Sequence, residues 1–226
     1  MVIKENKTEY GMSKFFSGIY LWMFVGLIIS GGVAYFTSVT PSMIRLVAGI
    51  YPIILIMELV VVIAFSALRK KASPKVAKIL FIIYSAISGL TLSSIFLVYK
   101  IESIGVVFLS SALMFGLLAV YGYLTKNDLS SIGKVLLFAL LAVIIMSLVN
   151  IFVGNSTFDI VISIISIVVF LGLTAWDMQS LKRIYEYYKN DERELSKMSI
   201  YGALDLYLDF INIFLELLNI FGKSKD

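Results

Sequence analysis

The 226-residue sequence contains no cysteine and no histidine, and these two absences exclude several classes of functional site. Without cysteine the chain has no disulfide framework, no thiol nucleophile and no cysteine metal site. Without histidine it has neither a Ser-His catalytic triad nor an imidazole pH switch. Any proton chemistry in this protein must therefore fall to carboxylates.

Charged residues are also scarce. They make up 15% of the chain, whereas 60% of the residues are hydrophobic and the mean hydropathy is +0.96. Such values lie far outside the range of an ordinary soluble domain. Lipid offers the backbone no hydrogen-bond partner, and continuous apolar runs without alternation favour helices over a barrel. The sequence therefore predicts an all-α integral membrane protein embedded in a lipid bilayer.

Charged residues delimit seven uncharged or nearly uncharged windows of about the length that a bilayer crossing of roughly 20 residues requires, the shortest being that between Asp159 and Asp177. We predict a single transmembrane domain over residues 1–226 with spans at about 15–37, 46–68, 76–99, 103–125, 133–154, 157–177 and 198–221. Thr40-Pro41, Ser73-Pro74 and the turn at 154–157 are expected to mark helix boundaries, because capping residues and first-turn prolines are found there.

Lysines and arginines predict the orientation in the membrane. Most of them fall in the N-terminal arm and in the connections after the second, fourth and sixth spans. The other side has only Arg45, Lys100, Lys223 and Lys225. The positive-inside rule then places the N-terminus in the cytoplasm and, after seven crossings, the C-terminus outside. The alternative is a re-entrant last helix, which would return the C-terminus to the cytoplasm. The net charge of +4 thus reflects topology and not nucleic-acid binding, and the short loops suit a prokaryotic plasma membrane.

The connection after the sixth span, MQSLKRIYEYYKNDEREL, has Leu181, Ile184, Tyr185 and Tyr188 at helical spacing with charges opposite. This pattern predicts an amphipathic extension of the sixth helix along the membrane surface. A solvated helical linker is the alternative.

The last apolar segment, ALDLYLDFINIFLELLNIF, also carries regularly spaced polar residues. These are Asp205, Asp209, Asn212, Glu216 and Asn219. They are separated by 4, 3, 4 and 3 residues, so they form one stripe along the helix. Asp209 would lie near mid-membrane, about 18 Å along the helix from Lys197. A central helix whose polar edge faces a cavity would tolerate such a stripe. The alternative is that some of these groups only form hydrogen bonds to neighbouring helices.

Three further ionisable residues lie at comparable depth. Glu58 interrupts the second span, and Arg69 follows about three turns later on the same face. Asp177 closes the sixth span. The predicted topology brings the ends of these two spans and the early part of the last span to one side of the membrane. Simpler roles are a positive-inside anchor for Arg69 and a solvated loop position for Asp177.

These acids indicate an ion pathway. Two carboxylates in a low-dielectric site do not both ionise cheaply, so they titrate as a coupled pair and provide a pH sensor. Ca²⁺ requires 6–8 oxygen ligands, and a stripe of Asp, Asn and Glu offers carboxylate and amide oxygens. The candidate pathway residues are Glu58, Asp205, Asn212 and Glu216.

Several stretches resemble the Bax inhibitor-1 family, also called the transmembrane Bax inhibitor motif family. They are LYLDFINIF in the last span, LTAWDMQSLK around Asp177, KNDLSSIGKVLLF and LVNIF. The stretch GLTLSSIFLVY departs from a Gly-Pro pattern of the family. The resemblance implies seven helices, with a central C-terminal helix wrapped by two three-helix layers. It also implies a calcium-leak channel that is gated by an aspartate pair and by pH.

Matched residue by residue, the pair would be Asp177 and Asp209, which would also offer ligands to Ca²⁺. Arg69 would be the latch that docks on both aspartates and closes the cytoplasmic mouth until acid weakens it. Glu58 resembles the family's acid in the second helix. The resemblance assigns nothing to Asp205 or Glu216.

Three other functions compete with a leak channel. Intramembrane aspartyl proteases use paired aspartates, but the stretch from Gly202 to Asp205 lacks the second glycine of their motif, so we expect no enzyme. Carboxylates also couple H⁺ to cation movement in secondary transporters. A membrane scaffold that regulates other proteins is the third. We expect no cofactor, with Ca²⁺ as the permeant ion and H⁺ as the regulator, and the sequence identifies no protein partner.

Overall fold

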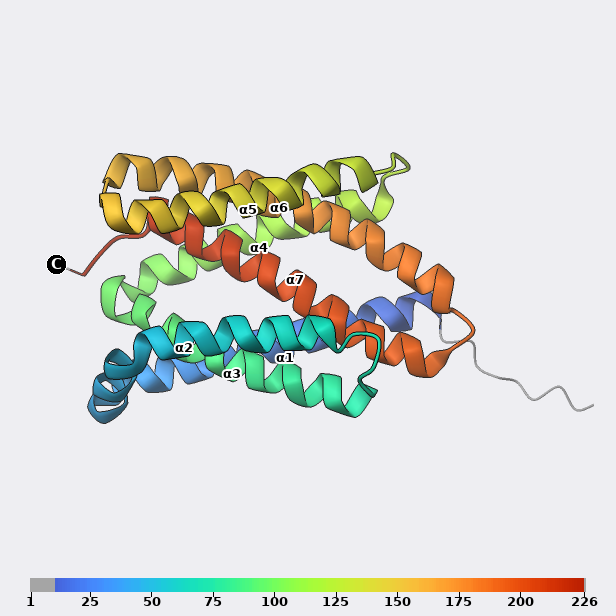
Figure 1. Cartoon of the computed structure of the whole chain (residues 1–226), viewed down its shortest axis with the longest axis horizontal. Coiled ribbons are helices and arrows are strands. Elements are labelled where there is room, and N and C mark those ends of the chain that lie inside the picture. Colours follow the sequence, from blue (N-terminus) through green and yellow to red (C-terminus); the bar gives the residue numbers. More distant parts are fainter. Residues whose placement is uncertain (1–10, 226) are drawn as a thin grey trace, which may run out of the picture.

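A computed structural model describes residues 11–225, which form seven α-helices (Figure 1). Their bounds are α1 Met12–Val39, α2 Pro41–Ala67, α3 Pro74–Val98, α4 Ile101–Leu124, α5 Ser130–Val153, α6 Ser156–Tyr188 and α7 Glu192–Phe221. The prediction of an all-helical chain is confirmed. Among the described residues, six helices, α1 to α6, are long and apolar enough to cross a membrane. The acids of α7 distinguish it from these six.

Short polar sequences set the helix ends. Ser73 caps α3 by accepting a hydrogen bond from the Val76 amide, and Asn155 caps α6 by accepting one from the Phe158 amide. Gly154 ends α5 with a φ of 66°, a left-handed conformation that glycine adopts without a side-chain clash. The three predicted boundary signals thus lie where helices begin or end.

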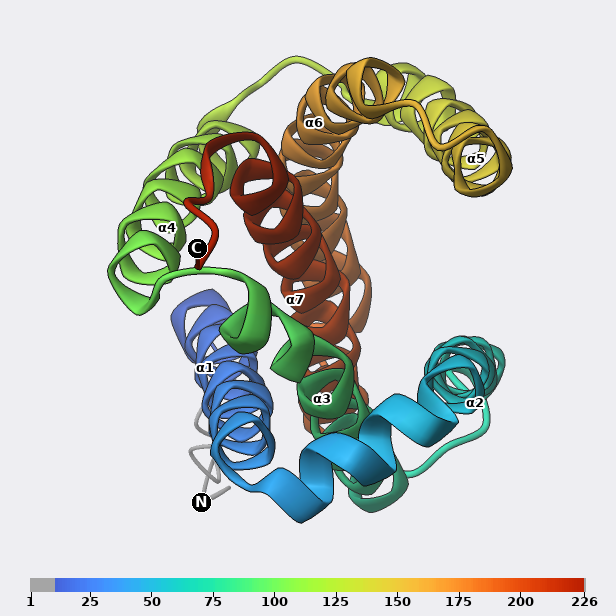
Figure 2. The same cartoon turned by 90° about the vertical axis from the view of Figure 1, so that its left-hand side faces the viewer.

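The helix α2 bends, and Pro52 lies inside it (Figure 2). Proline has no amide hydrogen for the carbonyl four residues earlier, and its ring crowds that carbonyl, so helices kink at such a position. The segments before and after the bend run in different directions (Figure 2). The second segment carries Glu58 and leads to Arg69.

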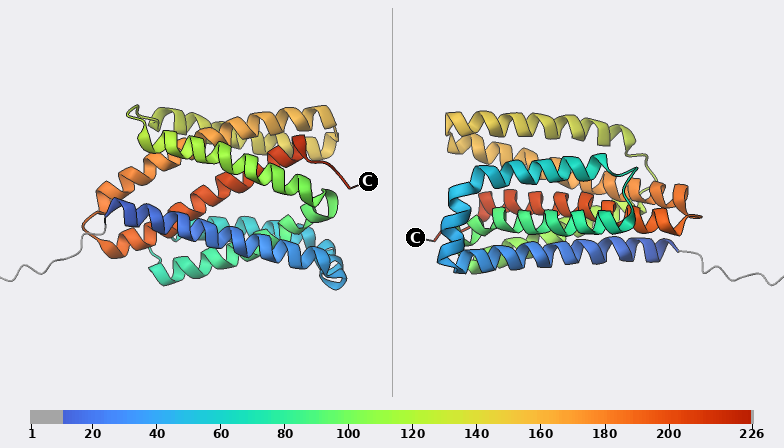
Figure 3. Two further views of the ribbon diagram at one scale, coloured as in Figure 1. Left: turned by 180° about the vertical axis from the view of Figure 1, so that it is seen from behind. Right: turned by 60° about the horizontal axis from the view of Figure 1, so that its bottom comes forward.

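Helix α7 runs through the middle of the bundle (Figures 1 and 2). It packs against α1, α3, α4 and α6, whereas α2 and α5 lie at the periphery. Helices α1, α2 and α3 contact one another, and α4 and α5 both contact α6. The two further views show the same arrangement from behind and from below (Figure 3). A helix surrounded in this way can keep polar side chains away from lipid.

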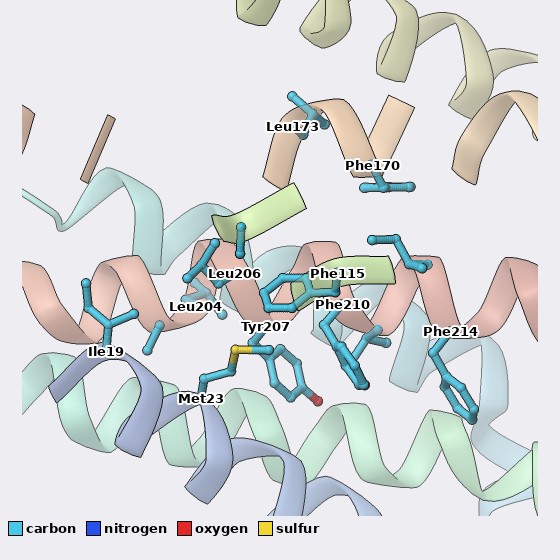
Figure 4. Packing of buried hydrophobic residues seen from close by; sticks show 14 of the residues in the cluster. Ile19, Met23, Phe115, Phe170, Leu173, Leu204, Leu206, Tyr207, Phe210 and Phe214 are labelled. Atoms are coloured by element: carbon cyan, nitrogen blue, oxygen red, sulfur yellow. The ribbon is translucent and has the colours of Figure 1, made fainter. Parts of the chain in front are cut away.

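Aromatic and aliphatic side chains of α7 fill the centre of the bundle (Figure 4). Tyr207 meets the ring of Phe81 on α3, and Phe210 meets Phe115 on α4 edge to face. The outer faces are also apolar, with Phe152 90% exposed and Leu113 71% exposed. An apolar exterior around a packed centre is the pattern expected of helices that lie in lipid.

The Lys- and Arg-rich segments gather at one end of the bundle. The start of α1 and the connections α2–α3, α4–α5 and α6–α7 all lie at the right-hand end in Figure 1. The remaining connections and the C-terminus lie at the opposite end. The alternation expected from the sequence is therefore present in the fold.

Helix α6 continues to Tyr188, well past the predicted span end at residue 177. The expected helical extension is present, and it packs against the protein. Leu181 is buried, and Tyr185 contacts the ring of Phe15 on α1. The extension thus supports the end of the bundle that carries the basic connections.

Candidate functional site

Three aspartates of α6 and α7 interact where these two helices pack together. Asp205 and Asp209 lie one turn apart on α7, and Asp177 lies on the facing helix α6. The side chains of Asp177 and Asp209 interact directly, and Asp205 lies near enough to both to interact with their charges. The pair predicted from the sequence is thus brought together.

Asp209 is the most enclosed of the three. The residue is only 4% exposed, and its carboxyl group lies beside Thr174 of α6, whose hydroxyl donates to the Phe170 carbonyl at 2.8 Å. The Oδ2 atom of Asp209 has no hydrogen-bond partner among the described residues. Two ionised carboxylates have no hydrogen to share, so a hydrogen bond between Asp177 and Asp209 requires that one of the two groups carries a proton.

Arg69 forms an ion pair with Asp205, and its Nη2 donates to Oδ2 at 3.0 Å. The sequence placed the arginine correctly at this end of the bundle, but its direct partner is neither Asp177 nor Asp209. Asp205 lies one turn closer to the α2–α3 connection, where the side chains of the pair are 35% and 31% exposed. A guanidinium reaches this half-exposed carboxylate with less loss of hydration than the buried Asp209.

Tyr201 completes the surroundings of Arg69. The guanidinium carbon lies 5.4 Å from the Tyr201 ring centre, a cation–π distance, and the Phe65 ring is stacked 4.4 Å from the same ring. The sequence analysis did not single out Tyr201. Its position one turn before Asp205 on the same face was the available signal.

Glu58 lies apart from the aspartates. It accepts hydrogen bonds from the hydroxyl of Tyr84 at 3.3 Å and from that of Thr91 at 2.8 Å, both on α3. The expected common face of Glu58 and Arg69 does not lead to a common contact, because Arg69 lies beyond the end of α2 and reaches α7. Glu58 therefore joins α2 to α3.

The polar stripe of α7 continues toward the opposite end, and part of it faces α6. Glu216 bonds to the hydroxyls of Ser163 and Ser166. Asn219 donates to Ser163 at 2.8 Å and to Asp159 at 3.1 Å. Hydrogen bonding to a neighbouring helix is thus confirmed for Asn219.

Asn212, midway along the stripe, donates to the Leu208 carbonyl of its own helix at 2.7 Å. The polar contacts between α6 and α7 therefore lie in two groups, one around Asp177 and Asp209 and one around Glu216 and Asn219. Phe170 of α6 and Phe210 of α7, both buried, lie between these groups in the sequence (Figure 4). The Phe210 ring packs against Phe108 and Phe115 of α4.

The aspartate pair alone would be an incomplete calcium site. Two carboxylates supply four oxygens, fewer than the 6–8 that Ca²⁺ takes. Within residues 11–225, no group of three or more Asp or Glu side chains has the arrangement of a metal site. Water or backbone oxygens would have to complete the shell of a passing ion.

Comparison with known proteins adds a family match. Residues 12–226 match the family model described as inhibitor of apoptosis-promoting Bax1. The chain is 42% identical over 219 residues to the inner membrane protein YbhL of Escherichia coli strain K12, covering 95% of this chain and 94% of that one. It is 39% identical over 226 residues to an uncharacterized protein of Deinococcus radiodurans, covering 100% and 97%. It is 36% identical over 224 residues to an uncharacterized membrane protein of Streptococcus pyogenes serotype M1, covering 97% and 96%.

Proposed function

This chain belongs to the Bax inhibitor-1 family of membrane proteins, and on that premise we propose that it is a pH-sensitive calcium leak channel. The observation that carries the proposal is the contact between the buried carboxyl groups of Asp177 and Asp209, with the Arg69–Asp205 ion pair beside it. The membrane in question is a prokaryotic plasma membrane, as for the inner membrane relative of Escherichia coli.

In this proposal α7 crosses the membrane as a seventh span. It lies between two three-helix layers, α1 to α3 and α4 to α6. The helix has 30 residues and is about 45 Å long, enough to cross about 30 Å of hydrocarbon. The basic connections face the cytoplasm together with the N-terminus, and the C-terminus faces outside. The gate then lies at the cytoplasmic end of α7.

The ion pair closes the pathway at neutral pH. Arg69 on the α2–α3 connection forms an ion pair with Asp205, which lies one turn from Asp209. This ion pair joins the end of α2 to α7. Acid neutralises the carboxylates, and the guanidinium then loses the charge that holds it. The ion pair therefore holds at higher pH, and the Ca²⁺ leak increases as pH falls.

Carboxylates at the α6–α7 interface provide the path for Ca²⁺ through the protein. A Ca²⁺ ion moving between the ends would meet Glu216 near one end and the aspartates near the other. Between these two positions it would exchange ligands with water and amide oxygens, which Ca²⁺ accepts alongside carboxylates.

The test is Ca²⁺ flux into proteoliposomes of the purified full-length protein between about pH 5 and about pH 8. Asp177→Asn and Asp209→Asn should each flatten the pH dependence, because an amide does not titrate. Asp128→Asn is the matched control: it removes a carboxylate from the α4–α5 connection at the same end of the bundle. The control should keep the wild-type profile.

Three results would contradict the proposal. Flux that ceases without an imposed proton gradient would indicate coupled cation transport instead of a leak. Wild-type flux in both aspartate variants would show that the pair is not the sensor. No flux at any pH from folded protein would favour a scaffold that regulates other proteins.

A further inference from the structure

A groove opens between α4 and α7 at the end of the bundle opposite the aspartates. Its volume is about 560 Å³. Along its length the lining is mostly apolar and comes from Val106, Val107, Ser110, Met114, Leu217 and Phe221. From Lys100 to Met114 the groove follows α4 for about 21 Å, more than the roughly 15 Å of hydrocarbon in one leaflet. Its length matches a lipid chain.

The walls of this groove face outward. Val106 is 65% exposed and Phe221 is 66% exposed, on neighbouring stretches of α4 and α7. Helix α4 is long and apolar enough to cross a membrane, and in the proposed function, on which this inference rests, α7 crosses beside it, so the medium outside these side chains is lipid. An apolar groove open to the bilayer is filled by the hydrocarbon around it.

The end of the groove nearest the α3–α4 connection is polar and cationic. Lys100, Glu102, Ser103 and Lys223 line it. The Lys100 amide donates to the Lys223 carbonyl at 2.9 Å, and the Lys223 amide donates to the Ser103 hydroxyl at 3.0 Å. These backbone hydrogen bonds hold the segment after α7 against the start of α4. Two lysines are thereby fixed at the same mouth.

The position of these lysines is unusual for this side of the membrane. Of the four cations at this end, only Arg45 lies away from the α3–α4 connection and the segment after α7. Lys225 joins the other two there, with its Nζ donating to the Phe96 carbonyl at 2.7 Å. Where the positive-inside rule leaves few cations, two of them, Lys100 and Lys223, line one groove. Glu102 is the acid among the lining residues, so lysines outnumber it at the mouth.

We propose that this groove binds one acyl chain of an anionic phospholipid, with the lipid phosphate at Lys223 and Lys100. The apolar wall accepts the chain, and the two ammonium groups complement the phosphate in charge. Because the mouth lies where α4 begins and α7 ends, the phosphate sits at headgroup depth while the chain follows α4 inward. The bound lipid joins the outer ends of these two helices.

Photocrosslinking tests this site directly. The full-length protein is reconstituted in vesicles containing a phosphatidylglycerol with a photoreactive acyl chain, and crosslinked residues are mapped by mass spectrometry. Crosslinks are expected on residues 106–114 of α4 and on the C-terminal turns of α7. Unlabelled phosphatidylglycerol should compete better than phosphatidylcholine with the same chains. Lys223→Gln should weaken that competition about fivefold, the effect of one surface cation on an anionic lipid.

Two variants make the result specific. Lys70→Gln also removes one positive charge, but at the α2–α3 connection at the other end of the bundle, and should leave the α4 crosslinks unchanged. Ser110→Phe places a ring in the groove from its exposed wall and should reduce the α4 crosslinks. The proposal would be overturned if phosphatidylglycerol and phosphatidylcholine reduced the crosslinking equally. It would also be overturned if phosphatidylglycerol competed as well in Lys223→Gln as in the wild type. Crosslinks confined to other helices would overturn it as well.

Discussion

The Nη2 of Arg69 lies 3.0 Å from the Oδ2 of Asp205, so the connection after α2 is joined to the central helix by an ion pair. The two residues are far apart in sequence, and α2 itself lies at the periphery of the bundle (Figure 2). Tyr201, one turn earlier on α7, supports the guanidinium through its ring. This ion pair must break if α2 is to move away from α7, and so must the contact between the Phe65 and Tyr201 rings.

Removing the guanidinium should open the proposed gate. Arg69→Gln is expected to raise Ca²⁺ flux at neutral pH and to reduce its further increase in acid, because the variant starts without the latch. A half-exposed ion pair contributes up to about 1 kcal/mol, so the rise should be roughly up to fivefold. Proteoliposome flux at neutral pH and in acid measures both effects.

The exposed pair Arg183–Asp128 at the same end of the bundle offers the matched control. Arg183→Gln should leave the flux and its pH profile unchanged. Asp205→Asn should repeat the effect of Arg69→Gln, and the double variant should add nothing to either single one, since both remove the same interaction. Additive effects would mean that the two residues act separately.

The class of fold could be predicted because it depends on composition and on runs of apolar residues. The stripe from Asp205 to Asn219 indicated one polar face of the last helix, since its spacing of three and four residues defines one face whatever surrounds it, but it did not indicate that part of this face meets α6. The partner of Arg69 could not be predicted. Neighbouring turns of α7 differ in depth by only about 5.4 Å, and the bend of α2 at Pro52 decides where the arginine ends.

The hydrogen-bond partners of Glu58 could not be predicted from the sequence either. Its hydroxyl partners Tyr84 and Thr91 are ordinary residues on α3, and no local spacing relates them to α2. Only the packing of α2 against α3 brings them together. Pairwise contacts between helices depend on register, which a single sequence does not contain.

Asp209→Asn should stabilise the folded protein. The amide of the variant can donate a hydrogen bond to Asp177 without a bound proton, and it cannot bring a second negative charge into the buried site. A gain of about 1 kcal/mol corresponds to a rise of roughly 2–4 °C in melting temperature for a chain of this size. Thermal unfolding in detergent at neutral pH measures it.

Asp209→Ala serves as the comparison, because alanine removes the charge without supplying the donor. It should gain less than the asparagine variant, since it offers Asp177 no hydrogen bond and leaves the buried space of the carboxyl group unfilled. A melting temperature below wild type for Asp209→Asn would show that the carboxyl group itself stabilises the site.

Glu58→Ala should destabilise the contact between α2 and α3. It leaves the hydroxyls of Tyr84 and Thr91 without their acceptor in a partly buried place, at a cost of about 1–3 kcal/mol. Glu58→Gln keeps a side-chain oxygen and should lose less. The measurement is thermal unfolding of both variants. Equal melting temperatures for the alanine and glutamine variants would mean that the hydrogen bonds contribute nothing.

Close approach of α4 to α6 depends on the missing side chain of Gly122. A Cβ atom built at this glycine would lie 2.1 Å from the Ala175 carbonyl oxygen, and backbone cannot shift as a flexible side chain does. Gly122→Ala should therefore separate the two helices and destabilise the protein by about 1–3 kcal/mol, the usual cost of overpacking.

Gly116→Ala on the same helix is the control, because nothing lies within 4 Å of its Cβ position. Alanine favours a helix more than glycine does, so the control should be neutral or slightly stabilising. Thermal unfolding compares the two, and equal melting temperatures would contradict the close packing at Ala175.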